Sequence, residues 1–89
     1  MKAIVTVIGR DQVGIIAGVC SLLAKNKVNI LDISQTILNE HFTMIMHVDL
    51  AASQIPFNEL SAALTESGEK MALAIHMQRE DIFEAMHRI

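Results

Sequence analysis

The residues best suited to bind a small ligand lie in the turn between Gly9 and Gly14. An apolar, β-branched run leads into this turn, and apolar residues at helical spacing follow it. A strand that joins a helix in this way presents free backbone N–H groups and the positive end of a helix dipole at one place, which favours a small anion. We therefore expect any small ligand of this protein to bind at the turn.

Two interpretations of the turn remain open at this stage. The carboxylate of Asp11 lies three residues before Gly14, where it can cap the following helix by accepting the N–H groups that a ligand would use. An incoming carboxylate is then repelled, and a ligand that presents an amine or amide to Asp11 is favoured. Gly14 either allows a ligand to approach the backbone closely or relieves crowding where the helix meets the sheet.

No nucleophile stands beside a base at a recognised catalytic spacing. Cys20 lies on or beside the apolar stripe of a predicted helix and has no cationic neighbour in sequence, so we interpret it as a small buried hydrophobe. His47 and His76 fall on different predicted strands, without the His-x-x-x-His or Cys-x-x-Cys spacing of a metal site. We expect surface or interface histidines, no metal or cofactor site, and no enzyme.

Composition narrows the class of protein. The 89 residues are enough for one domain, spanning 1–89, with a thin margin of stability. Hydrophobic residues make up 52% of the chain and aromatic residues only 3%, which predicts an aliphatic core filled by methionine and apolar surface left for self-association. The net charge is −3 and the basic residues are scattered, which argues against nucleic acid as a partner.

The chain also shows no sign of a membrane segment. No apolar run approaches the ~18 residues of a membrane-spanning helix, and the N-terminus leads directly into a strand pattern instead of a signal peptide. The single cysteine excludes an internal disulfide framework. We expect a cytoplasmic protein.

The elements that must position the turn follow from hydrophobic periodicity. In chain order they are a strand over 2–8 covered on both faces, a helix over 15–27, a half-buried strand over 30–38, a tight connection at Asn39-Glu40, a strand over 42–50, a helix from Ser53 to Gly68, a strand over 71–79 and a short docking helix over 80–89. Ser53 is the expected cap of the second helix and Gly68 its expected end.

This order predicts an α+β fold of the ferredoxin-like β-α-β-β-α-β type, with an antiparallel sheet, both main helices on one face and a short C-terminal helix. Apart from that last helix, nothing in the chain covers the opposite sheet face. Ile45, the alternate residues of the first strand, Ala72 and Ala74 are then exposed. We expect a second subunit to cover them, and therefore a homodimer.

Two segments resemble a known family. AIVTVIGRDQVGIIAGVCSLLAKNKVNILDISQ is similar to the opening half of an ACT domain, with a first strand, an Asp-x-x-Gly turn, a helix and Val-Asn-Ile at the second strand. QREDIFEAMHRI is similar to the tail of free-standing single-ACT-domain proteins of bacteria and archaea. The resemblance implies a regulatory module that dimerises and binds a small effector, often an amino acid, at the dimer interface near the first turn.

Carried over to this sequence, the resemblance implies a site made of turn residues and the start of the second strand. We include Arg10, Asp11, Gln12, Val13, Gly14, Ile15 and Asn29. Asn29 either forms hydrogen bonds to an effector or holds its own turn in an unusual backbone conformation, and turn chemistry is slightly favoured. Amino-acid-sensing members often have Asn where Asp11 stands and Pro where Val13 stands. Because no enzyme domain is attached, the resemblance implies that the regulated protein is a separate one. The alternative is a protein–protein interaction module with no small ligand.

Overall fold

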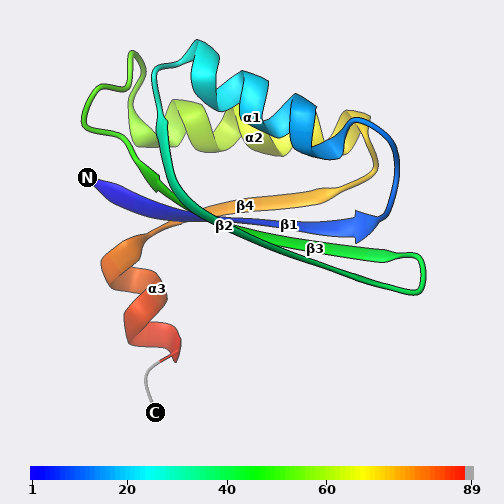
Figure 1. Ribbon diagram of the computed structural model, residues 1–89. Helices are drawn as coiled ribbons and strands as arrows, with labels where there is room; N and C mark the ends of the chain where they lie inside the picture. The colour runs from blue at the N-terminus through cyan, green and yellow to red at the C-terminus, as the bar shows by residue number, and fades with distance from the viewer. Residues whose placement is uncertain (88–89) are drawn as a thin grey trace.

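A four-stranded antiparallel sheet carries two helices on one face and a third helix at one end of the other face. The computed structural model describes residues 1–87. Its elements are β1 Lys2–Arg10, α1 Ile15–Lys25, β2 Asn29–Leu38, β3 His41–Asp49, α2 Phe57–Lys70, β4 Ala74–Arg79 and α3 Glu80–His87. The strand order is β2-β3-β1-β4, with α1 and α2 together above the sheet (Figure 1). The ferredoxin-like α+β prediction is confirmed, while residues 88–89 of the predicted last helix lie outside the described residues.

β1 is the central strand, and it pairs antiparallel with both β3 and β4. Ala3, Val5 and Val7 point toward the helices and are fully buried, so they form the middle of the core. The prediction that this strand is covered on both faces is wrong for a single chain. On the opposite face, Ile8 is 49% exposed because neither α1 nor α2 lies there.

Both predicted ends of the second helix are also wrong. α2 begins directly after Pro56 and has no side-chain cap. The Ser53 hydroxyl is used locally instead: it donates to the Ile55 carbonyl at 2.7 Å and accepts from the Ile55 N–H at 3.3 Å. Gly68 does not end the helix, which runs on to Lys70. Gly68 is buried in the last turn, where α2 packs against β4.

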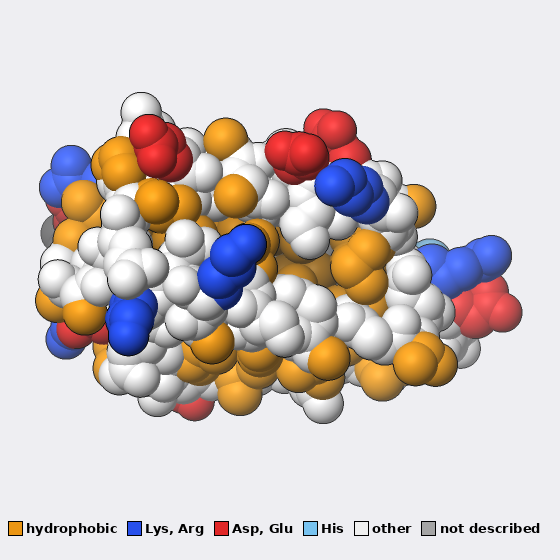
Figure 2. Space-filling model, turned by 90° about the horizontal axis from the view of Figure 1, so that it is seen from above, with side chains coloured by type: hydrophobic (Ala, Val, Ile, Leu, Met, Phe, Trp, Pro, Cys, Tyr) orange, Lys and Arg blue, Asp and Glu red, His pale blue; other side chains and the backbone are white. Residues whose placement is uncertain are grey.

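β2 is an edge strand that the helices do not cover. A register shift between Ile30 and Asp32 sets which residues beyond it face the helix layer. Ile33 and Ile37 face that layer, yet they are 42% and 52% exposed. The strand predicted to be half-buried is therefore exposed along most of its length. In the view from the helix side, hydrophobic side chains reach the surface in patches and along one long edge (Figure 2).

The open face of the sheet largely has the composition predicted for it. Ile45, Ile8 and Ala74 are exposed there, as expected. Ala72 is exposed too, but it belongs to the turn before β4, where its φ of 56° is left-handed. A sheet face with exposed isoleucines is unusual for a monomer that stays alone in solution.

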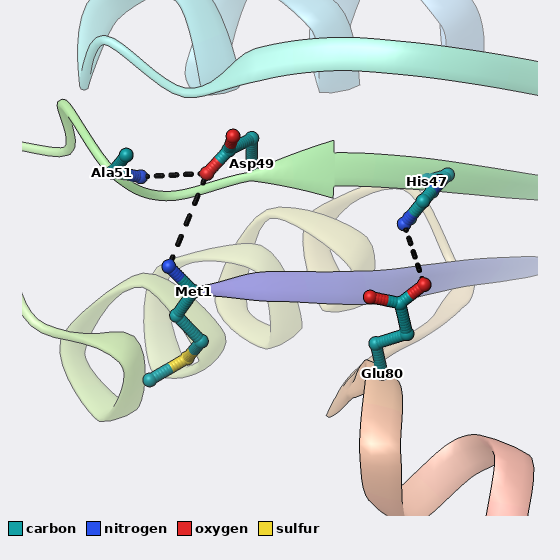
Figure 3. A network of polar contacts seen from close by, with 5 residues as sticks. All are labelled: Met1, His47, Asp49, Ala51 and Glu80. Carbon is teal, nitrogen blue, oxygen red and sulfur yellow. Dashed lines mark hydrogen bonds and ion pairs between the residues drawn. The ribbon is translucent and has the colours of Figure 1, made fainter.

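α3 is tied to the open face at its start. It descends from the end of β4, on the side opposite α1 and α2 (Figure 1). Glu80 Oε1 lies 3.1 Å from His47 Nε2 on β3 (Figure 3). The approach is not aligned for a hydrogen bond, so the contact is an ion pair when His47 is protonated. Arg79 and Asp81 pair at 3.0 Å beside it. None of the helices within residues 1–87 is long and apolar enough to cross a membrane.

Candidate functional site

The turn predicted to bind a ligand ends on a helix whose first amides are uncapped. Gly14 is the N-cap of α1 and has a φ of 92°, a left-handed conformation that glycine adopts without strain. Nothing lies within 4 Å of a Cβ built there, so crowding is not the reason for the glycine. No side chain caps α1, and the interpretation of Asp11 as its cap is therefore wrong. The N–H groups of the first turn have no partner within the helix.

Three contacts hold the turn in place from its two sides. The Asp11 N–H donates to the Glu40 carbonyl at 2.8 Å, which ties the turn to the β2–β3 hairpin. The Arg10 guanidinium pairs with the Glu40 carboxylate at 3.0 Å on the same side. On the other side, Gln12 Nε2 donates to the Met71 carbonyl at 2.8 Å. The Gln12 amide therefore positions the turn, and the Asp11 carboxylate is exposed.

A pocket of about 210 Å³ opens between this turn, α1 and β2. Its lining joins the turn and first helical residues to side chains from β2 and β3: Asp11, Gln12, Gly14, Ile15, Ile16, Ala17, Gln35, Ile37 and Phe42. The floor is apolar, and Asp11, Gln12 and Gln35 supply polar groups. A few polar groups around an apolar floor are typical of small-molecule sites.

Sequence reasoning missed the wall of this pocket. Gln35 and Ile37 come from β2 and Phe42 from β3, and all three face the helix layer. One signal was available for Gln35. It is a polar residue between Ile33 and Ile37, on the side of the strand that otherwise carries apolar residues.

A second hollow of about 220 Å³ lies on the other side of Asp11. Arg10, Asp11, Asn39 and Glu40 line it, so it is polar throughout. The cation that could attract an anion there is already paired with Glu40. Asp11 thus borders both hollows, but only the first also contains the amides of α1.

The register separates Asn29 from the other predicted site residues. Asn29 aligns with Asp49 at the start of β2, whereas the turn follows Arg10 at the opposite end of the sheet. Eight strand steps of about 3.3 Å place these ends roughly 26 Å apart. Within one chain Asn29 therefore lies far from the turn, and a site that contains both residues has to form across the predicted dimer interface. Val13 does belong to the turn, and its side chain is fully exposed.

The other chemically capable residues form no centre. Cys20 is partly buried and packs against the core, as interpreted. His47 and His76 share the open face, but β1 lies between their strands, which separates them by about 10 Å, two strand spacings. Among the described residues, no group of three or more His, Cys, Asp or Glu could hold a metal ion.

Comparison with known proteins agrees with this architecture. The family profile of the ACT domain matches residues 2–78. The chain belongs to the ACT domain family. A UPF0237 protein of Clostridium acetobutylicum is 56% identical over 89 residues, which is all of both chains. The solved ACT domain protein from Streptococcus pneumoniae is 42% identical, has a TM-score of 0.82 and covers 98% of each chain.

The fold also recurs as part of a larger regulatory protein. The regulatory subunit of aspartate kinase from Thermus thermophilus, in its ligand-free form, has a TM-score of 0.68 at 24% identity. The match covers 89% of this ACT domain and 51% of the regulatory subunit. At this identity the likeness concerns the fold alone.

Proposed function

We propose that this ACT domain is a sensor of a small metabolite and regulates a separate protein in the cytoplasm. The observation that carries the proposal is the pocket of about 210 Å³ at the uncapped start of α1. The occurrence of the same fold in a kinase regulatory subunit supports a regulatory role. The proposal assigns the protein no reaction, because the pocket offers binding groups without a nucleophile paired to a base.

The chemistry of the pocket favours an amino acid or a close relative. The free N–H groups of α1 suit a carboxylate, since they carry the positive end of the helix dipole. The exposed carboxylate of Asp11 suits an ammonium or amide group nearby. Ile15, Ile37 and Phe42 offer an apolar floor for a side chain. A plain anion without an amine meets the repulsion of Asp11.

We further propose that two copies of the chain associate through the exposed edge of β2. This edge has unpaired backbone groups and carries Ile33 and Ile37, both more than 40% exposed. If a two-fold axis pairs the two edges antiparallel, Asn29 of the partner subunit lies near Leu38, at the end where the pocket opens. The dimer then unites the turn of one copy with the start of β2 of the other, and the site is incomplete in a monomer.

A thermal-shift screen against amino acids and small anionic metabolites tests the sensor function. A ligand at about 100 times its Kd stabilises the protein by ~2.7 kcal/mol. If the screen finds a ligand, that ligand should no longer stabilise the Gln35→Ala variant, because Gln35 lines the pocket. Thr36→Ala is the matched control, since Thr36 is the next residue but faces the open side of the sheet.

Two further outcomes separate the parts of the proposal. Loss of binding in Asn29→Ala supports the shared site, whereas retained binding there restricts the site to one chain. A flat screen at millimolar concentrations contradicts the sensor function. It favours the alternative, an interaction module that recognises a partner protein through an edge strand or α3.

A further inference from the structure

The middle of the open face carries no charged side chain, and α3 stands at one end of it, where Lys2, Asp32 and Asp49 also lie on this face. Ile8 and Ile45 are exposed at its middle, beside small side chains such as Thr6 and Thr43. α3 projects from the sheet at the end where β4 finishes, on the side opposite α1 and α2. The β2–β3 hairpin extends beyond the other end of the sheet (Figure 1). This side of the molecule is therefore a sheet face with one helix projecting from its end.

We propose that this open face binds the open face of a second copy, with α3 of each copy placed against the far end of the other sheet. This second interface is independent of the edge of β2 and of any ligand. A chain that uses both interfaces forms a tetramer, built as a pair of dimers.

The shape of one copy selects the symmetry. A two-fold axis that runs between the sheets and crosses the strands exchanges their ends, so the two α3 helices stand at opposite ends. An axis parallel to the strands would place both helices at one end, where they compete for the same space. The eight residues of α3 span about 12 Å, which matches the roughly 10 Å spacing of packed sheets. Each α3 is thus long enough to reach the edge of the other sheet.

The charged groups of this arrangement lie at its two ends. The described side chains of α3 include three acids, Glu80, Asp81 and Glu84, and no base. At the far end of the open face, β1 ends at Arg10 and β3 begins at His41. Arg10 is paired with Glu40 there, and Asp11 lies beside both, so His41 is the group left for an acid of α3. Glu84 of one copy then approaches His41 of the partner subunit. The rows of the face around Ile45 and Ile8, between the two ends, carry no Lys, Arg, Asp or Glu.

The area suffices for a stable contact. Four strands at a spacing of about 4.8 Å and nine residues at about 3.3 Å give a face of roughly 19 Å by 30 Å. Two such faces bury at least about 1,100 Å² between them, before the sides of α3 are counted, and a specific interface needs about 1,000 Å².

Light scattering on matched variants tests the proposal. Ile45 and Ile33 are both 42% exposed and lie on neighbouring strands, but they face opposite sides of the sheet. The chain weighs 9.8 kDa, so four copies weigh about 39 kDa and two about 20 kDa. We expect Ile45→Lys to halve the mass of the wild-type assembly. An unchanged mass in a variant with normal circular dichroism overturns the proposal.

Ile33→Lys separates the failure of this interface from that of the edge of β2. If the wild type is a dimer that only Ile45→Lys breaks, the open face is the interface and the edge-to-edge dimer falls. If only Ile33→Lys breaks it, the open-face proposal falls and the edge-to-edge dimer stands.

Disulfide trapping gives a second readout that needs no charged substitution. In a Cys20→Ser background, we expect Glu84→Cys and His41→Cys chains to form a mixed disulfide when combined. Glu84→Cys with Thr65→Cys is the control, because Thr65 is exposed on α2, on the helix side. Equal trapping of both pairs, or trapping of neither, contradicts the proposed placement of α3.

Discussion

Replacing Gly68 by alanine should destabilise the protein, although alanine is the better residue for a helix. A Cβ at this position would lie 2.8 Å from Ile75 Cγ1 and 2.8 Å from the Leu73 carbonyl oxygen. The side chain of Ile75 can move, but the backbone of Leu73 cannot do so freely, because its N–H donates to the Gly68 carbonyl at 2.8 Å. The end of α2 and the start of β4 would have to separate.

The magnitude follows from two opposing effects. Overpacking of a well-packed core costs about 1–3 kcal/mol. Alanine in place of glycine returns up to about 1 kcal/mol of helix propensity. Because the new Cβ would meet a backbone oxygen at 2.8 Å, the overpacking cost falls in the upper part of its range, about 2–3 kcal/mol. We therefore expect a net loss of about 1–2 kcal/mol, which lowers the Tm by roughly 4–16 °C in a domain of this size. Urea denaturation measures the loss in the free energy of unfolding. The protein concentration has to be kept fixed, because association makes the stability concentration-dependent.

Gly18 provides the control within the same fold. It is exposed in α1, and a Cβ there would meet only Met71 Sδ at 3.7 Å, an ordinary van der Waals contact. Gly18→Ala should therefore stabilise the protein by about 0.5–1 kcal/mol. Opposite signs for the two variants support the close approach of α2 to β4. A Gly68→Ala variant as stable as the wild type would refute it.

Three further changes test the contacts around the turn and α3. Asp11→Ala should change the free energy of unfolding by less than about 0.5 kcal/mol, whereas a true cap would cost about 1 kcal/mol; urea denaturation distinguishes the two. Gln12→Leu removes the hydrogen bond to Met71 and should cost about 0.5–1 kcal/mol in the same assay; no change would show that the bond does not hold the turn. Glu80→Gln should speed hydrogen exchange of α3 amides with under about 1 kcal/mol of global loss, and unaltered α3 exchange would contradict docking through His47.

The fold could be predicted because its signals are local and agree with one another. Val5 and Val7, or Met44 and Met46, alternate with residues of the other face along strands that pair as expected. The exceptions arise where a distant contact overrides a local signal. Gly68 has the composition of a helix end, yet β4 packs against it so closely that glycine is required inside the helix.

The site could be predicted only in part, because a pocket is made by segments that meet in space. The turn itself was found, since its glycines and its place between a strand and a helix are sequence features. Its wall comes from residues of two further strands. Phe42 follows the alternation expected of β3, but nothing in the sequence brings it to the turn. The side on which Gln35 lies is set by the register shift in β2, and its one sequence signal is its position between Ile33 and Ile37. The place of Asn29 shows a related limit: the family pattern gives its distance from the turn along the chain, but not that the two lie at opposite ends of one sheet.

The uncapped start of α1 and the uncovered edge of β2 are best understood as one feature. Helix amides are normally satisfied by a nearby side chain, and Asp11 is at hand. Its backbone is held by Glu40 instead, on the side of the hairpin, and Gln12 is held by Met71. The Asp11 carboxylate is therefore exposed and the Gln12 amide is bound to Met71, so neither side chain caps the helix. The pocket they leave open borders Ile37 on the edge strand β2. A ligand bound there would contact any chain that pairs with β2, so binding and association would be coupled thermodynamically, each strengthening the other by the same factor.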